Sequence, residues 1–335
     1  MIIRFDQIRE KYGNEVEGIL TEFHKKAATT TGRAISEMSS YHFETGGKRI
    51  RALIPSYIYE VMGHNGRDFL PFGAAVEMIH NATLVHDDLQ DGDEMRRSRP
   101  TVWKKYSEAQ AINCGDAMFQ YAYQILRTLK LDATTVLKLV DRAADATLRV
   151  IEGQAQEFIV KEEDYPGVKR YLEVIRGKTS GLFALPVVGA LEACGVGKDL
   201  CKTVESVAMD LGVLFQVQDD FLDLYGDKGR DRRGTDIAEG KISYFIAYVN
   251  EKGSPADRKR LGEIVKKHRE QTTDAEILEA IQILDRAGAK KAAMNLMEEI
   301  QSQVKNHKEL KTELPGIHMA LIELAELFLK PIQNT

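Results

Sequence analysis

Apolar residues recur at three- and four-residue intervals along most of this chain, which places them on one face of a helix. Alternation typical of strands is scarce. Turn-forming residues such as Gly and Pro fall between the helical segments. Helices are predicted over 72–89, 115–129, 135–160, 182–193, 201–224, 276–287 and 290–304. The pattern therefore indicates an all-α fold.

No feature of the sequence suggests a division into domains. The chain has no linker rich in Pro, Gly or Ser, no block of one charge and no internal repeat. Its 335 residues, 43% of them hydrophobic, are enough to bury a large core. We therefore expect one domain over residues 1–335, with ligand sites between facing helices of a bundle.

Two acidic clusters lie on two of the predicted helices. Each has two adjacent aspartates and a third one three residues further on: Asp87, Asp88 and Asp91, then Asp219, Asp220 and Asp223. Residues four apart share a helix face, so the first and last members of a cluster present oxygens to one point. Carboxylates this close repel one another, and hard cations relieve the repulsion. One such cluster would fit a solvated helix face equally well, but two together predict a polynuclear magnesium site.

Further short motifs follow one another in order along the chain. They are Gly46-Gly47-Lys48-Arg49-Ile50-Arg51, Arg96-Arg97, Gly115-Asp116, Glu152-Gly153-Gln154, Lys178-Thr179, Phe215-Gln216 and Gly240-Lys241. With these motifs the sequence resembles the trans-isoprenyl (polyprenyl) diphosphate synthases, such as geranylgeranyl and farnesyl diphosphate synthases, over nearly its whole length. The resemblance implies the isoprenoid synthase fold: one polyprenyl synthase domain, a large helical bundle around a deep central cavity.

The resemblance also implies a role for each aspartate. Asp87, Asp91 and Asp219 match direct magnesium ligands, whereas Asp88, Asp220 and Asp223 match residues that hold coordinated waters or orient the site. Family members typically gather three Mg²⁺ ions, for which Mn²⁺ can substitute. Such ions neutralise the pyrophosphate that leaves when an allylic diphosphate ionises.

Two substrates are implied, each with its own basic residues. Arg96, Lys178 and Lys241 match positions that grip the allylic diphosphate, while Thr179 and Gln216 place neutral oxygens near the nascent carbocation. The residues that match the pocket for isopentenyl diphosphate are Lys48, Arg51, His80 and Arg97. Lys178, Thr179, Gln216 and Lys241 are thus the expected catalytic residues. The implied reaction is head-to-tail condensation of isopentenyl diphosphate with dimethylallyl, geranyl or farnesyl diphosphate, giving an all-trans polyprenyl diphosphate and pyrophosphate.

Product length is expected to depend on residues that precede the first cluster. Ile79, Ala82 and Thr83 would border a tunnel for the growing chain, and none is aromatic. This predicts a product of twenty carbons or more. A neighbouring helix could instead supply a floor through Met118, Phe119 and Tyr123, so a farnesyl (fifteen-carbon) synthase is the alternative.

One loop departs from the family pattern. Many members carry a lysine where this chain reads Gly229-Arg230-Asp231-Arg232-Arg233, and Arg230, Arg232 or Arg233 is expected to supply the charge. Three other classes remain open. A metal-dependent phosphohydrolase would fit His86-Asp87 but needs further histidines, and a noncatalytic subunit would lack part of a cluster. A class I terpene cyclase would need the allylic half-site alone.

Composition limits the other possibilities. A net charge of −5 gives no electrostatic case for nucleic acid. Cys114, Cys194 and Cys201 lack CxxC spacing, which argues against a disulfide framework or a structural zinc site. No apolar signal core or uninterrupted apolar run of membrane-spanning length is evident, so a cytoplasmic protein is expected. The family resemblance further implies a homodimer, for which the helix over 111–129 is a plausible contact.

Overall fold

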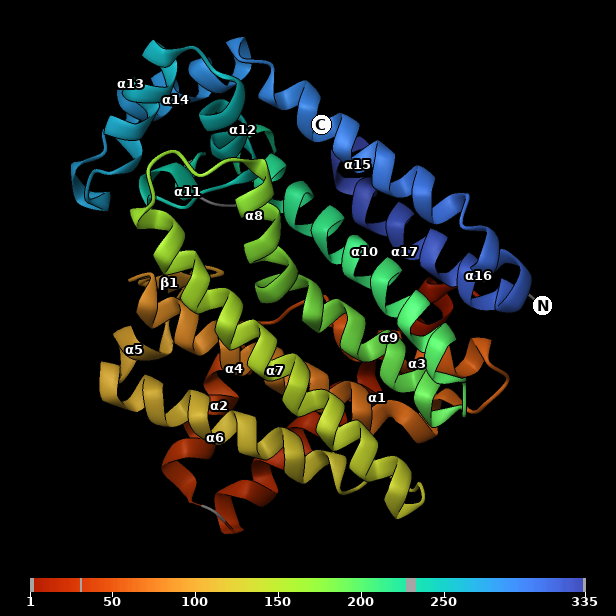
Figure 1. The fold of residues 1–335 in the computed structure, drawn as a ribbon. Coiled ribbons are helices and arrows are strands. Elements are labelled where there is room, and N and C mark those ends of the chain that lie inside the picture. Colours follow the sequence, from red (N-terminus) through yellow and green to blue (C-terminus); the bar gives the residue numbers. More distant parts are fainter. Residues whose placement is uncertain (1–2, 31, 227–232, 334–335) are drawn as a thin grey trace. The chain divides into compact units, whose positions relative to one another are not determined.

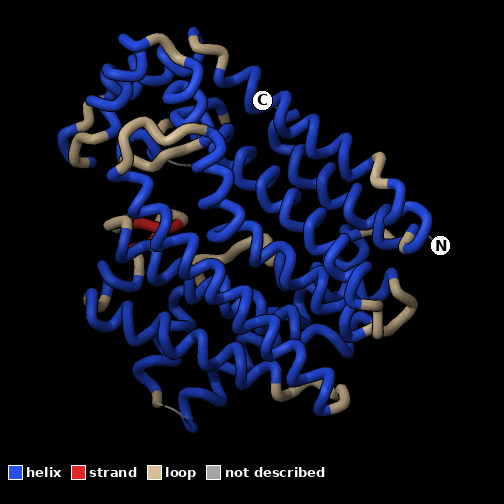
Figure 2. Tube along the Cα trace, in the orientation of Figure 1, coloured by secondary structure: helices blue, strands red, loops and turns tan. Residues whose placement is uncertain are grey.

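A computed structural model describes residues 3–30, 32–226 and 233–333. These residues form helices and, among them, one short antiparallel hairpin of β1 (Met95–Arg96) and β2 (Arg99–Pro100), as Figures 1 and 2 show. The predicted all-α class is confirmed. Contacts divide the chain into two compact units, Met1–Thr147 with Ala184–Glu205 and Leu148–Phe183 with Ser206–Thr335. This division does not test the expectation of a single domain, which stays a prediction.

The first unit is built around α4 (Leu70–Gln90), which packs against α1, α3 and α6. Its other elements are α1 (Phe5–Thr30), α2 (Arg33–Phe43), α3 (Ile50–Val61), η1 (Gly66–Phe69), the hairpin, α5 (Val102–Lys105), α6 (Glu108–Leu126) and parts of α7 (Ala133–Glu162), α9 (Gly181–Ala193) and α10 (Lys198–Tyr225). Two glycines let these helices approach closely. A Cβ on Gly73 would lie 1.9 Å from the carbonyl oxygen of Ala52, and one on Gly115 would lie 2.2 Å from His86 Nε2.

The second unit holds the remaining parts of α7, α9 and α10. Its other elements are α8 (Val168–Ile175), the π-helical turn η2 (Arg176–Ser180), α11 (Thr235–Ala238), α12 (Tyr244–Lys252), α13 (Pro255–Val265), η3 (Arg269–Gln271), α14 (Asp274–Arg286), α15 (Ala289–Lys305), α16 (Lys308–Glu313) and α17 (Pro315–Gln333). Side-chain caps begin several of these helices: Ser243 accepts from the Ile246 amide at the start of α12. Gly153 of α7 lies against η2, where its Cβ would be 2.1 Å from the amide nitrogen of Lys178.

The hairpin makes a tight turn without glycine. Met95 pairs with Pro100 and Arg96 with Arg99, which leaves Arg97 and Ser98 as the two turn residues. Their φ angles are 49° and 62°, and positive φ at both central residues is what a type I′ turn requires. The turn therefore carries backbone strain at two residues that have side chains.

One helical stretch, Val168–Ala193, is long and apolar enough to cross a membrane by length and composition. This stretch was not anticipated by the sequence analysis. Within its most apolar window, 78% of the residues are buried inside the structure, as they would be in the core helix of a globular protein. The stretch is therefore weak support for a membrane span.

Candidate active site

The first aspartate cluster ends α4, in the first unit. Asp91 is the residue that caps the helix, and its amide donates to the Asp87 carbonyl oxygen at 2.8 Å, so the two lie one helical turn apart as predicted. Asp88 between them is buried and faces Arg96. Arg96 Nε lies 2.8 and 2.9 Å from the two carboxylate oxygens of Asp88, and Nη2 lies 2.5 Å from Oδ1. The hairpin thus returns Arg96 onto the middle aspartate.

Burial controls the electrostatics of Asp88. It raises the pKa of this carboxyl group to about 6, while the hydrogen bonds and charge of Arg96 act in the opposite direction. A bidentate guanidinium is the strongest partner that a buried carboxylate finds among side chains. Asp88 therefore holds Arg96 in place on the side of α4 next to Asp87.

The residues predicted for isopentenyl diphosphate gather in the first unit. Arg51 Nη1 lies 3.3 Å from His80 Nε2, and the guanidinium of Arg97 donates to the carbonyl oxygen of Gly46. Burial, followed by the charge of Arg51, lowers the pKa of His80 well below its ordinary value. Because a guanidinium can only donate, His80 is neutral and accepts through Nε2. Lys48 on the same loop is exposed.

The second cluster lies on α10 in the second unit, with Asp219 and Asp223 one turn apart. Asp220 is buried between three donors. Its Oδ2 accepts from the Tyr171 hydroxyl at 2.8 Å and from the Tyr244 amide at 2.9 Å, and its Oδ1 accepts from Gln216 Nε2 at 3.0 Å. Burial, followed by the charge of Asp236, raises the pKa of Asp220 to about 7.

The expected catalytic residues of the second unit occupy η2, α10 and the turn before α12. The Thr179 hydroxyl donates to Gln216 Oε1 at 2.9 Å, so these two side chains lie together. Lys178 forms an ion pair with Glu157 of α7, and Lys241 Nζ lies 2.8 Å from Glu239 Oε2. The cationic groups are thus each held beside a carboxylate.

The aspartates do not form a closed metal cage. Among residues 3–30, 32–226 and 233–333, no group of three His, Cys, Asp or Glu side chains could hold a metal ion. The middle aspartates face protein donors, which leaves Asp87 with Asp91 in the first cluster and Asp219 with Asp223 in the second. Asp223 is itself buried, and its Oδ2 accepts from the Asp236 amide at 3.2 Å. Mg²⁺ is usually bound by one or two carboxylates, several waters and substrate phosphates. The chemistry of each pair fits that mode of binding.

Sequence reasoning did not identify several residues of this arrangement. Tyr171 precedes Lys178 by seven residues, and no motif connects it with Asp220. Glu157 likewise carries no spacing that would assign it to Lys178. In the loop that lacks the usual lysine, 229–232 lie outside the described residues, and Arg233 is exposed.

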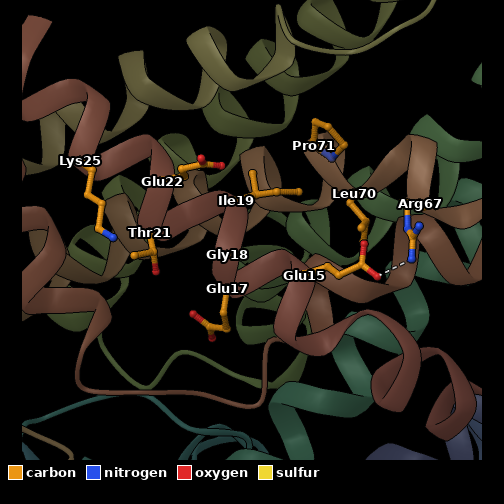
Figure 3. Close-up of a pocket in the computed structure, with 10 residues that line it drawn as sticks. All are labelled: Glu15, Glu17, Gly18, Ile19, Thr21, Glu22, Lys25, Arg67, Leu70 and Pro71. Carbon is orange, nitrogen blue, oxygen red and sulfur yellow. Dashed lines mark hydrogen bonds and ion pairs between the residues drawn. The ribbon is translucent and has the colours of Figure 1, made fainter.

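Two grooves are formed by other described residues. One of about 620 Å³ follows α1 and the start of α4, with Glu15, Glu17 and Leu70 in its wall (Figure 3). Arg67 Nη2 lies 2.9 Å from Glu15 Oε1 there. Another of about 650 Å³ is lined by Tyr225 and the start of α15. Neither is lined by a cluster aspartate.

The helical fold, the paired aspartates and the grouped basic residues are those of a prenyl diphosphate synthase. Residues 33–284 match the family described as Polyprenyl synthetase, and the chain belongs to this family of trans-prenyltransferases in isoprenoid biosynthesis. The expected resemblance is confirmed.

Relatives and solved structures agree. The chain is 37% identical over 244 residues to a short chain isoprenyl diphosphate synthase of Methanocaldococcus jannaschii, covering 71% of this chain and 72% of that protein. It is 29% identical over 337 residues to a geranylgeranyl pyrophosphate synthase of Geoglobus acetivorans, covering 98% and 99%. A geranylgeranyl pyrophosphate synthetase from Pyrococcus horikoshii matches with a TM-score of 0.85 and 26% identity, covering 97% of this chain and 98% of that one.

Proposed function

We propose that this enzyme condenses isopentenyl diphosphate head to tail with an allylic diphosphate, giving an all-trans polyprenyl diphosphate of about twenty carbons and pyrophosphate. The observation that carries the proposal is that α4 and α10 each bear two carboxylates one helical turn apart. In both helices the aspartate between them is held by protein donors. The geranylgeranyl synthases among its relatives support the product length.

Enzymes of this family generally depend on a divalent metal. We infer that Asp87, Asp91 and Asp219 bind Mg²⁺, three ions per site, with Asp223 orienting the second half-site. The bound ions supply positive charge that stabilises the departing pyrophosphate. Asp88 keeps Arg96 directed along the first half-site, where its guanidinium can donate to a phosphate oxygen.

Thr179 and Gln216 suit a site where positive charge develops on carbon. The hydrogen bonds run in one direction, from the Thr179 hydroxyl to Gln216 Oε1 and from Gln216 Nε2 to Asp220. The Thr179 proton therefore points toward Gln216, and the lone pairs of the Thr179 oxygen remain available to a cation. Aligned hydrogen bonds polarise one another, which strengthens this oxygen as an electrostatic partner.

Isopentenyl diphosphate is expected to bind near the loop that carries Lys48 and the start of α3, which carries Arg51. Neutral His80 accepts from Arg51 and orients its guanidinium without adding a proton to the pocket. Arg97, held at Gly46, contributes a second guanidinium. The pyrophosphate released from the first substrate is the expected acceptor of the final proton.

Chain length is the finer part of the proposal. Ile79, Ala82 and Thr83 are all buried on α4, and none is aromatic. Met118 on α6 is buried as well, so a floor supplied by α6 keeps a farnesyl synthase as the alternative.

A homodimer is proposed as the assembly. On α6, Ile112 is exposed, whereas the unit-two part of α7 exposes Leu148, Ile151, Phe158 and Ile159. Residues at this spacing form one apolar helical stripe, of a kind that marks protein interfaces. Sedimentation of the purified chain tests the assembly. A cytoplasmic location stays a prediction.

The test of the function is a product assay. Purified protein is incubated with Mg²⁺, labelled isopentenyl diphosphate and each allylic starter, and the dephosphorylated products are sized. We expect labelled twenty-carbon product, and none after a metal chelator is added. Loss of the allylic substrate without incorporation of label would instead indicate a cyclase, and release of phosphate alone a phosphohydrolase.

Two variants test the metal ligands. Asp87→Ala and Asp219→Ala should each lower turnover by orders of magnitude, because each removes an inferred Mg²⁺ ligand. Stability should change little, because each also removes a carboxylate that repels its neighbours. Asp199→Ala changes an exposed aspartate on the same helix as Asp219 and should keep normal turnover. Near-normal turnover in either ligand variant would contradict the assigned role.

A further inference from the structure

Arg49 stands inside the basic motif Gly46–Arg51, yet its side chain does not face solvent. It is 7% exposed, whereas the adjacent Lys48 is exposed. Its backbone has a φ of 47°, a left-handed conformation at the residue that caps α3. This conformation is unfavourable for a residue with a Cβ, so the surrounding contacts must hold it.

Every nitrogen of the Arg49 guanidinium has a partner in the first unit. Nε lies 2.6 Å from Glu17 Oε1 on α1, and Nη1 lies 3.2 Å from Glu77 Oε1 on α4. Nη2 donates to the Phe43 carbonyl oxygen at the end of α2, at 3.1 Å. The guanidinium carbon also lies 5.0 Å from the centroid of the Phe43 ring. One side chain thus connects the loop to three helices.

The two carboxylates differ in a way that allows them to be tested separately. Glu77 is buried and also accepts from Asn81 Nδ2 at 3.2 Å, so its removal would leave polar groups without partners. Glu17 is half-exposed and lies in the wall of the α1 groove (Figure 3). A change at Glu17 can therefore weaken the contact to Arg49 without opening the core.

We propose that Arg49 is a positioning residue for isopentenyl diphosphate: its buried ion pairs with Glu17 and Glu77 hold the loop so that Lys48 and Arg51 are set for the diphosphate. The inference rests on the proposed function. With its three nitrogens engaged by protein oxygens, Arg49 is not itself a ligand of the substrate. Gly47 lies against this guanidinium, since a Cβ there would be 3.3 Å from Arg49 Nη1.

The geometry predicts which substitutions matter. A lysine at position 49 keeps the charge but is a single point of donation, so it cannot reach acceptors on three helices at once. Arg49→Lys should raise the KM for isopentenyl diphosphate at least tenfold. Glu17→Gln keeps an acceptor but loses the charge, and should raise the same KM about three- to tenfold. In both variants the KM for the allylic substrate should stay within twofold.

Glu15→Gln is the matched control. Glu15 lies on the same helix, lines the same groove and also pairs with an arginine, Arg67, but it does not contact the loop. Its kinetic constants should equal those of the wild type. In the double variant Arg49→Lys with Glu17→Gln, the KM for isopentenyl diphosphate should be no higher than in Arg49→Lys alone. Both changes break the same contact, the one between Arg49 and Glu17.

Two measurements that need no turnover accompany the kinetics. Calorimetry gives the affinity for isopentenyl diphosphate alone, which should fall three- to tenfold in Glu17→Gln. Limited trypsin digestion should cut the 46–51 segment, which joins the loop to the start of α3, faster in this variant than in Glu15→Gln. Unchanged affinity and cleavage in Glu17→Gln would overturn the proposal, as would equal rises in both KM values. A wild-type protein that neither binds nor incorporates isopentenyl diphosphate would overturn the proposed function as well.

Discussion

Gly153→Ala is expected to damage the enzyme by adding one methyl group. Gly153 lies in α7, and a Cβ there would be 2.1 Å from the amide nitrogen of Lys178 and 2.7 Å from the carbonyl carbon of Gly177. Both are backbone atoms of η2, which cannot rotate away as a side chain could. Ordinary van der Waals contacts of a Cβ begin at 3.4 Å, so η2 would have to move by roughly 1 Å.

Two opposing terms set the size of the effect. Alanine is favoured over glycine within a helix by about 1 kcal/mol. Overpacking a close contact costs about 1–3 kcal/mol, and a backbone neighbour places this case at the upper end. The net expectation is a loss of roughly 1–2 kcal/mol in the free energy of unfolding. Because η2 carries Lys178 and Thr179, a shift of about 1 Å should lower kcat about 100-fold.

Denaturant unfolding and the product assay measure the two effects. Gly18→Ala serves as the control, since Gly18 is exposed on α1 and a Cβ there meets nothing within 4 Å. That variant should gain stability and keep its activity. If Gly153→Ala is at least as stable as the wild type with unchanged turnover, the close approach of α7 to η2 is not required and the reasoning is refuted.

Two further predictions concern buried polar groups. Tyr171→Phe removes a hydroxyl donor from buried Asp220, which should cost about 1–3 kcal/mol of stability and lower kcat about tenfold; equal kcat and unfolding midpoint would contradict this. Burial lowers the pKa of His24 to about 4, so below pH 6.5 the unfolded chain takes up a proton that the folded protein does not. Stability should therefore fall by roughly 2 kcal/mol between pH 7 and 5 through His24. His24→Asn should lose this component, and equal pH dependence of urea unfolding in both proteins would exclude it.

The helices were predictable because each must bury an apolar face. The predicted segments 72–89 and 201–224 correspond to α4 and α10, which run two or three residues further at their starts. The clusters could be placed on helices for the same reason. Their carboxylate spacing is local, and a local rule applies to it.

The partners of the middle aspartates could not be predicted. Arg96 reaches Asp88 because a hairpin turns back toward α4, and Tyr171 reaches Asp220 across α8 and α10. Asp88 and Arg96 are 8 residues apart and Tyr171 and Asp220 are 49 apart, and no helical periodicity encodes either contact. The hairpin was missed for another reason, since its turn lacks the Asn-Gly or Asp-Gly sequence that signals a positive φ at both central positions.

That turn bears on how this enzyme can change over evolutionary time. Selection for thermal robustness alone would favour asparagine or glycine at positions 97 and 98, where φ is positive. Ser98→Gly is thus a substitution that should make the protein more stable to heat. At position 97 a change to asparagine or glycine would remove the guanidinium that donates to the Gly46 carbonyl oxygen. Adaptation to heat should therefore alter the second turn residue and spare the first.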